Sequence, residues 1–247
     1  MPRIPLVEEL TSEPVPLGSI LMIEYDPASQ WYATFSAIAA GWIRSGGKVH
    51  YNVGSGPPDD VRAQLKMLGL NVGALEADGK LIILDWYTAT LGQKSKEKYA
   101  FDSLKVADLS IRFTKAAKGD ESSAIPPPVS PDVLRIHDDI SALFRFNDEK
   151  STVEFILTRF IPHQWKGFGR FIAGAIRGIH SDWVYNQLEA QCHGVIDLKL
   201  DETSRGPANL IRIRTLRNVG FDPKWHELRV GDGSQVTLAE RRLEASR

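Results

Sequence analysis

A stretch near the amino end has the spacing of a phosphate-binding site. Between Gly18 and Gly41, the apolar run 20–23 leads into a short loop and then into an Ala-rich segment, 32–43, that predicts a helix. A strand–loop–helix junction binds nucleotide phosphates when loop glycines let backbone N–H groups point at them, with a lysine and a Ser or Thr for Mg²⁺ nearby. The sequence therefore predicts the scaffold of a nucleotide site here.

The side chains of this junction do not supply that chemistry. The loop contains Pro27, which has no N–H, and the bulky Tyr25, Trp31 and Tyr32, and it has no glycine. The first lysine of the chain is Lys48, well beyond the junction. Charge-assisted hydrogen bonds contribute roughly 1.5–3 kcal/mol each, so losing several would make ATP binding undetectable. We therefore expect a retained scaffold without its catalyst.

Two acidic residues flank the same loop. Glu24 and Asp26 would repel a phosphate, and they favour the positive amino end of the helix that follows. We expect them to fill that helix end. The alternative is that they hold a cation in a vacant phosphate site.

A second candidate group is His137-Asp138-Asp139, which has the residue types of a metal site or an acid–base pair. Neighbours on a strand point to opposite faces, so Asp138 and Asp139 cannot share one site if the strand continues through them. The six histidines show no metal-ligand spacing, and we predict no metal. Cys192-His193 has the types of a nucleophilic pair, although packing at a helix end explains these neighbours better.

Two cationic stretches are candidates for binding a macromolecule. The segment 165–171, Trp-Lys-Gly-Phe-Gly-Arg-Phe, interleaves aromatic and basic residues, as single-stranded nucleic-acid sites do. It is otherwise a plain loop between a helix and a strand. Arg212, Arg214 and Arg217 form a ladder with Arg212 and Arg214 on one strand face. This ladder is either a solvated edge or a surface that meets a neighbouring subunit.

Composition describes an ordinary α/β protein. The 247 residues are 43% hydrophobic, carry a net charge of −1 and include one cysteine. The charge gives no general attraction to nucleic acid or anionic membrane, and the single cysteine excludes an intramolecular disulfide framework. No stretch approaches the length of a membrane span or a signal peptide. We expect a single domain, 1–247, in the cytoplasm.

The pattern alternates strands with helices through most of the chain. Residues 92–131 form a loop-rich insertion, with a helix or strand expected in 101–113. Turn clusters at 201–207 and 218–223 separate three period-2 segments near the carboxyl end. The expected strands are 20–23, 49–53, 81–84, 133–136 and 170–176, then 195–200, 210–216 and 225–230; the expected helices are 32–44, 59–67, 151–160 and 181–191. The order predicts an α/β fold, a mostly parallel sheet flanked by helices with an antiparallel carboxyl-terminal extension.

The order of these elements resembles the KaiC-like branch of the RecA/P-loop ATPases over roughly 15–238. Gly18-Ser-Ile-Leu-Met-Ile and Gly79-Lys-Leu-Ile-Ile-Leu-Asp carry the resemblance in the first half. The more specific match is His193-Gly-Val-Ile, followed by Arg212-Ile-Arg-Thr-Leu-Arg and Trp225-His. The resemblance implies a RecA-like sheet, and full-ring hexamers are common among such proteins. Loss of nucleotide between subunits removes one source of ring cohesion, so a monomer or dimer is equally plausible.

The resemblance places the family's catalytic positions on residues that mostly differ from it. The Walker A Gly-Lys-Thr falls at Ser29, Gln30, Trp31 and Tyr32, in a loop about one residue longer than the family's. The catalytic Glu pair falls at Gly54-Ser55, and the trans-acting lysine falls at Thr215, although Arg217 is kept. Asp138 matches the Walker B aspartate, in a strand that Arg135 and His137 interrupt.

The resemblance and the lost catalytic groups together predict a KaiC-like homologue without catalysis, of a prokaryotic, archaeal signalling type. It would act by self-association or with a protein partner, using the surface near Arg212–Arg217, and it would need no cofactor. One alternative is an atypical ATP-binding switch or weak ATPase, with Asp138 holding Mg²⁺. The other is a RecA-like module that binds nucleic acid through 165–171.

Overall fold

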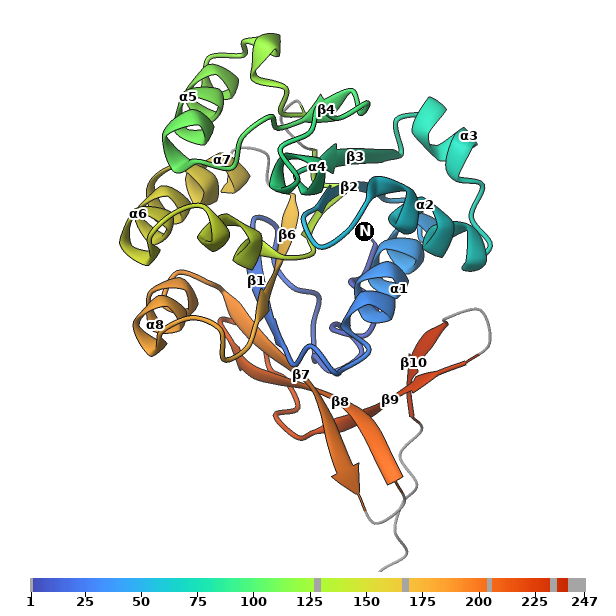
Figure 1. Ribbon diagram of the computed structural model, residues 1–247. Helices are drawn as coiled ribbons and strands as arrows, with labels where there is room; N and C mark the ends of the chain where they lie inside the picture. Colours follow the sequence, from blue (N-terminus) through green and yellow to red (C-terminus); the bar gives the residue numbers. More distant parts are fainter. Residues whose placement is uncertain (1, 127–129, 166–168, 204–205, 232–234, 240–247) are drawn as a thin grey trace, which may run out of the picture.

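Ten strands of the described chain form one sheet, in the order β10-β9-β8-β7-β1-β6-β5-β2-β3-β4 (Figure 1). The computed structural model describes residues 2–126, 130–165, 169–203, 206–231 and 235–239. The strands are β1 (Ile20–Tyr25), β2 (Lys48–Val53), β3 (Leu81–Asp85), β4 (Tyr99–Ala100), β5 (Val133–His137), β6 (Arg170–Ile176), β7 (Gly194–Thr203), β8 (Gly206–Leu216), β9 (His226–Val230) and β10 (Val236–Leu238).

The centre of the sheet is parallel and its carboxyl-terminal part is antiparallel. β1 lies between β6 and β7, with Ile23 opposite both Gly174 and Ile196. β8, β9 and β10 then add in antiparallel order. Burial on both faces explains why β1 is an unbroken run of buried residues. The α/β fold with an antiparallel extension is thus confirmed.

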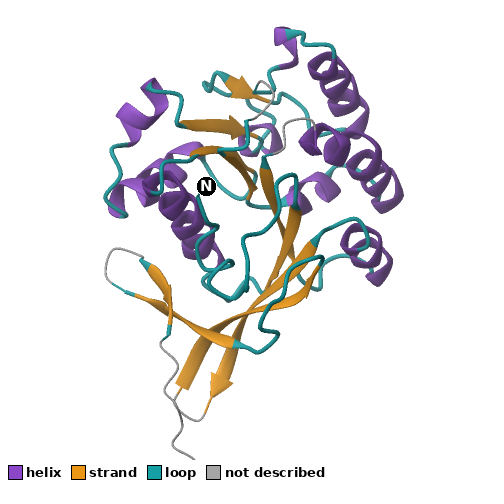
Figure 2. Ribbon diagram, turned by 180° about the vertical axis from the view of Figure 1, so that it is seen from behind, coloured by secondary structure: helices purple, strands orange, loops and turns teal. Residues whose placement is uncertain are grey.

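Helices cover both faces of the sheet (Figure 2). One face packs against α1, α2 and α3, and the other packs against α5, α6, α7 and α8. The helices are α1 (Trp31–Arg44), α2 (Pro58–Met67), α3 (Val72–Ala77), α4 (Tyr87–Thr90), α5 (Val106–Ala117), α6 (Glu149–Phe155), α7 (Ile161–Trp165) and α8 (Asp182–Glu189), with 3₁₀ turns η1 (Glu121–Ser123) and η2 (Ile140–Arg145) and a π-helical turn η3 (Ile156–Phe160).

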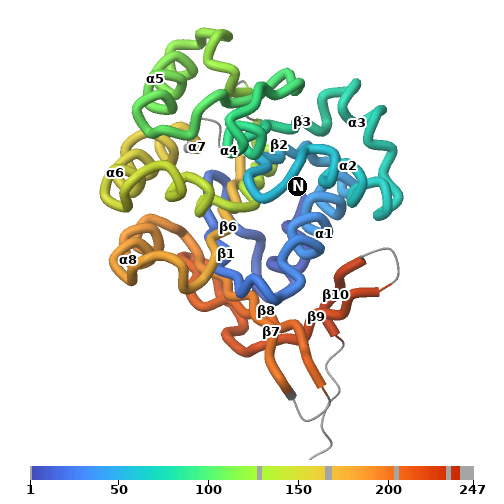
Figure 3. The backbone as a smooth tube through the Cα atoms, in the orientation of Figure 1, coloured from blue at the N-terminus to red at the C-terminus, as the bar shows by residue number. Residues whose placement is uncertain are grey.

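The structure departs from the expected elements in three places. Of the helix or strand expected in 101–113, the structure has a helix, the twelve-residue α5, which lies later, at Val106–Ala117, because Leu109 and Phe113 bury one helical face. The expected helix 151–160 runs through a π turn into α7, where Pro162 has no N–H to continue the α-helical ladder. The bounds predicted for the turn, 201–207, were wrong, because β7 and β8 remain paired as far as Thr203 and Gly206. These strands extend beyond the helical layers (Figure 3).

The amino-terminal segment is fixed to the rest of the chain by a buried carboxylate. Glu8 accepts hydrogen bonds from the backbone of Ile4 and Val15, at 2.7 and 2.6 Å. Its Oε1 lies 4.0 Å from Nη2 of Arg170, on β6. Both charged side chains are buried, so removing either one would leave a buried charge without its partner.

Candidate functional site

The backbone N–H groups of the β1–α1 loop already donate hydrogen bonds to acceptors of the protein. The N–H of Ala28 donates to Asp26 Oδ1 at 2.8 Å, and the N–H of Ser29 donates to the Asp26 carbonyl at 2.9 Å. The N–H of Gln30, immediately before α1, donates to Oδ1 of Asn209 at 2.8 Å. A phosphate at this junction would have to displace these acceptors. The predicted position of Walker A therefore carries a loop that is bonded to protein groups.

Aromatic rings fill the space beside the loop. Trp31 stacks on Tyr25 with ring centroids 4.7 Å apart, and it meets Tyr32 and Phe35 edge-on. Such pairs stabilise a packed cluster beyond the area that they bury. Burial and the charge of Asp138 raise the pKa of the Tyr32 phenol, so Tyr32 stays neutral. It does not replace the cation that a phosphate-binding lysine would supply.

Asp138 lies at the carboxyl end of β5, fully buried, and its carboxylate is taken up by the chain. Oδ1 accepts from the N–H groups of Gly54 and Ser55, at 2.8 and 3.2 Å. Oδ2 accepts from the Ser55 hydroxyl at 2.7 Å. Burial raises the pKa of Asp138 to about 6, and these hydrogen bonds oppose the shift. The two residues at the predicted Glu-pair position thus hold the aspartate predicted for Walker B, through their backbone N–H groups and the Ser55 hydroxyl.

Asp139 is a neighbour of Asp138 in space as well as in sequence. The expectation that the pair must face opposite ways assumed a continuing strand, but β5 ends at His137. Asp139 instead precedes η2, where its Oδ1 accepts from the Ser141 N–H at 2.8 Å. Burial, and next the charge of Asp138, raise the pKa of Asp139 to about 7. Asp138 and Asp139 are thus both buried, and each carboxylate accepts from its own backbone donors.

Gly54 is packed closely at this point. A Cβ on Gly54 would lie 3.1 Å from the Asp139 carbonyl oxygen and 3.5 Å from the Ala142 side chain. A larger residue here must push on the backbone that follows β5. The position at which the family has a catalytic glutamate and this chain has Gly54 is therefore one where a larger side chain would not fit without rearrangement.

The two polar residues that interrupt β5 are structural. Nδ1 of His137 lies 3.2 Å from the Asn52 carbonyl, and its ring packs on Trp86 at 4.3 Å. Burial lowers the pKa of His137 to about 4. Arg135 donates to Gln164 at 2.6 Å, and burial lowers its pKa to about 10. Both side chains belong to the buried layer beneath α7.

Glu24 does not fill the end of α1, which is a correction to the sequence expectation. It is buried, and its Oε1 lies 2.7 Å from Arg214 and its Oε2 3.3 Å from Arg177. The reason is that Glu24 points to the α8 face of the sheet, on the opposite side from α1. Asp26 does serve the loop, as described above, although it lies outside the first turn of the helix.

The predicted arginine ladder takes part in this same ion cluster. Arg212 lies 2.7 Å from the buried Asp197, and Arg214 is 3.4 Å from the same carboxylate. Arg217 donates to the Ala190 carbonyl at 2.7 Å. Arg212 and Arg214 do share a face, as expected, and about a third of each side chain remains exposed. Their charges are largely balanced within the chain.

The aromatic–basic segment 165–171 does not present its described arginine to solvent. Residues 166–168 lie outside the described residues. Arg170 is buried, donates to the Val15 carbonyl at 2.9 Å and lies over the Trp42 ring. Phe171 is a buried residue of β6. Neither side chain is placed to contact a nucleic acid.

Neither of the remaining candidates has a reactive environment. Cys192 is buried, which raises its pKa to about 12, so its thiol stays protonated. Nδ1 of His193 accepts instead from the Ile20 N–H at 3.1 Å. Among the described residues no group of three His, Cys, Asp or Glu side chains is arranged to hold a metal ion.

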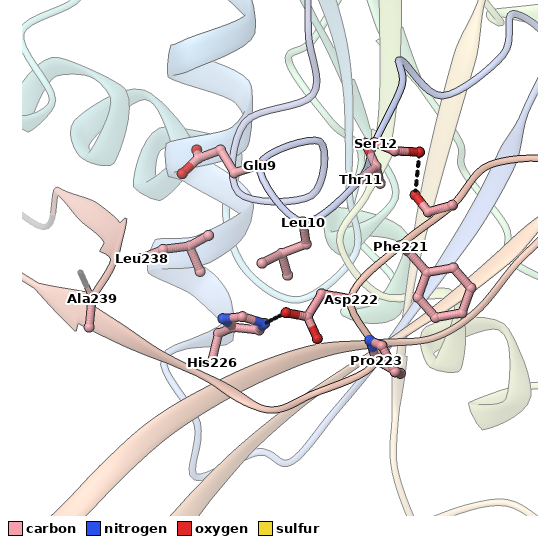
Figure 4. Close-up of a pocket in the computed structure, with 11 residues that line it drawn as sticks. Glu9, Leu10, Thr11, Ser12, Phe221, Asp222, Pro223, His226, Leu238 and Ala239 are labelled. Carbon is pink, nitrogen blue, oxygen red and sulfur yellow. Dashed lines mark hydrogen bonds and ion pairs between the residues drawn. The ribbon is translucent and has the colours of Figure 1, made fainter. Parts of the chain in front are cut away.

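A groove near the carboxyl-terminal strands is lined by none of the residues of the β1–α1 loop. It has a volume of about 730 Å³ and lies between the amino-terminal segment and the β8–β10 region. Figure 4 shows Leu10 and Leu238 facing into it, with the His226–Asp222 pair at its side. Nε2 of His226 lies 3.4 Å from Asp222. None of the residues predicted as Walker A or Walker B lines it.

Sequence reasoning missed Asn209 as a partner of the loop. It lies 179 positions from Gln30, on β8 but just before the strand expected at 210–216. The only local signal was a polar residue between the small residues and the apolar run of that strand. Its role depends on β8 lying next to β7, which is itself next to β1.

The mostly parallel sheet with its antiparallel carboxyl-terminal strands is that of a RecA-like fold. No protein-family model matches the chain, and no curated protein sequence matches it. Among solved structures, the KaiC-like protein PH0186 from the archaeon Pyrococcus horikoshii superposes with a TM-score of 0.70 at 15% identity, over 97% of each chain. The flagellar accessory protein FlaH from Methanocaldococcus jannaschii superposes with a TM-score of 0.71 at 16% identity, over 98% of this chain and 100% of that one.

These likenesses establish the fold. At 15–16% identity they do not carry over an activity. Among the described residues, no helix has both the length and the apolar character that a bilayer crossing requires.

Proposed function

We propose that this chain is a non-catalytic protein of the KaiC-like fold that acts through contacts with other proteins. The observation that carries the proposal is the occupied β1–α1 loop, whose N–H groups already bond to Asp26 and Asn209. Nucleotide binding would cost those bonds and the Trp31 stacking, with no lysine to compensate. Each hydrogen bond to a charged phosphate is worth about 1.5–3 kcal/mol, so a loop whose N–H groups are already occupied loses most of the free energy of nucleotide binding.

The chain also lacks the side chains that ATP hydrolysis requires at the predicted catalytic positions. Phosphoryl transfer depends on positioned charge and on a residue that orients the attacking water. Gly54 and Ser55 provide no carboxylate, and Asp138 is committed to their backbone and hydroxyl. An ATP-binding switch with Mg²⁺ on Asp138 would first have to release that carboxylate from its three donors.

A role in an assembly fits the retained fold. FlaH is by its name a flagellar accessory protein, and we propose an accessory role of this general kind here. The exposed parts of Arg212, Arg214 and Arg217 are the proposed contact surface. We place the protein in the cytoplasm, where the single thiol of Cys192 would stay reduced.

Calorimetric titration with Mg-ATP, repeated with ADP, tests the proposal. We expect no heat of binding at ligand concentrations below about 1 mM. Micromolar binding that is lost in Asp138→Ala would overturn the proposal in favour of the ATP-binding switch. ATP turnover well above a buffer control that survives substitution of Trp31 would also overturn it.

A further inference from the structure

A charged segment before β4 has a regular arrangement that the proposed function does not use. In Lys94-Ser-Lys-Glu-Lys98 the three lysines are exposed, whereas Ser95 and Glu97 are only partly exposed. The segment bends at Glu97 and Lys98, and the Glu97 N–H donates to the Ser95 hydroxyl oxygen at 3.0 Å. One side of this segment faces the protein, and the other displays three cations.

The inward side chains fix the segment at two points. The Ser95 hydroxyl donates to Oδ2 of the buried Asp85 at 2.6 Å. Glu97 accepts from both terminal nitrogens of Arg62, at 2.8 and 2.7 Å. A bidentate guanidinium–carboxylate pair sets orientation as well as distance. The lysines are therefore displayed from a segment that α2 and β3 hold in place.

The three lysines are not neutralised within the described part of the chain. Lysine ion pairs form there at Lys48, Lys80 and Lys199, and none involves Lys94, Lys96 or Lys98. Lys98 lies over the Tyr99 ring at 5.2 Å. Glu97 does not offset them, because Arg62 engages its carboxylate. The result is a cluster of like charge in a chain whose net charge is −1.

The segment also adjoins an edge of the sheet. It leads directly into β4, the last strand of the sheet order, which pairs with β3 alone among the described strands (Figure 1). A fully extended chain from Lys94 to Lys98 would span about 13 Å, and the bend at Glu97 and Lys98 makes this cluster of lysines shorter than that.

We propose that the surface formed by Lys94, Lys96 and Lys98 binds a short acidic segment of a partner protein. This inference deepens the proposed function and rests on it for the expectation that the chain acts through protein contacts. Lysines beside an edge strand also discourage sheet-to-sheet aggregation. Protection of the edge strand would not require the segment to be anchored at Ser95 and Glu97. The test therefore includes variants that remove these anchors.

The test measures the fluorescence anisotropy of a labelled short oligo-glutamate peptide with the full chain, at about 50 mM salt. We expect saturable binding that falls about tenfold or more in Lys94→Gln/Lys96→Gln/Lys98→Gln. The matched control is Lys105→Gln/Lys118→Gln/Lys150→Gln, which removes the same charge from other exposed lysines. Circular dichroism verifies that each variant folds.

Two further variants separate anchoring from charge. Ser95→Ala keeps the charge and removes the bond to Asp85, so we expect weaker binding. Glu97→Gln makes the chain more positive, so charge alone predicts tighter binding; we expect weaker binding because the anchor to Arg62 is weakened, and tighter binding would overturn the role of that anchor. No binding to the wild-type chain would overturn the proposal, as would equal losses in both lysine triples. Tighter binding to a single-stranded oligonucleotide of equal charge would also overturn it. None of these results depends on ATP, so the proposed function stands or fails separately.

Discussion

The backbone N–H of Gln30 donates to the side-chain oxygen of Asn209 over 2.8 Å, although 179 positions separate the two residues. In a phosphate-binding loop, N–H groups at this junction face a phosphate oxygen. Here a strand of the antiparallel extension supplies the acceptor. The carboxyl-terminal part of the sheet thus completes the amino-terminal loop, and the two cannot change independently.

Asn209→Ala should lower the free energy of unfolding by about 0.5–1.5 kcal/mol, since the Gln30 N–H loses its acceptor. Asn209→Asp is the matched control, because it retains an oxygen acceptor and places negative charge near the start of α1. It should equal or exceed the wild type. Urea unfolding measures both. Equal losses in the two variants would mean that the bond contributes nothing.

Gly54→Ala should destabilise the chain by about 1 kcal/mol or more, because the new Cβ would lie 3.1 Å from the Asp139 carbonyl oxygen. Gly56→Ala is the control two residues on, where the nearest atom, Oδ2 of Asp60, is at an ordinary 3.6 Å. That change should be neutral or slightly stabilising. Thermal unfolding of the pair distinguishes close packing at Gly54 from a general effect of alanine in the loop.

Asp139→Asn should stabilise the protein at pH 8 and have little effect near pH 4. The folded pKa of Asp139 is raised to about 7 from 3.8, so its stability contribution is fully present below pH 4 and is lost as the pH rises through 7. Asparagine keeps an acceptor for the Ser141 N–H and removes the buried charge. We expect a gain of about 1–3 kcal/mol at pH 8 by urea unfolding. A gain that is the same at both pH values would contradict the raised pKa.

His50 and His137 should remain neutral at pH 5 in the folded protein. Burial lowers their pKa values from 6.5 to about 3 and about 4. The stability that they contribute is present above pH 6.5 and is lost as the pH falls through those folded values. NMR titration of the imidazole signals measures this directly, with the urea-unfolded chain as control. Titration near pH 6.5 in the folded state would contradict the buried placement.

Much of the fold followed from local pattern. The runs at 20–23 and 171–176 are apolar on both faces, which is what a central parallel strand requires, and both lie in strands. Helix α5 was harder to predict, because only Leu109 and Phe113 of its twelve residues are buried. The ends of β7 and β8 were also missed, since polar residues at the turn remain paired in an exposed ladder.

For the candidate site, the sequence predicted only which residue types are missing. The sequence by itself determined that no lysine or glycine occupies the β1–α1 loop and that Gly54 and Ser55 carry no carboxylate. Side-chain identity is sufficient for such statements. The tertiary structure decided where the remaining polar groups find partners, because those partners lie far apart in the chain. Asn209 reaches Gln30, Ser55 reaches Asp138, and Glu24 reaches Arg214 only once the sheet order is set. Buried donors and acceptors must be paired, and which pairs form depends on strand order rather than on neighbours in sequence.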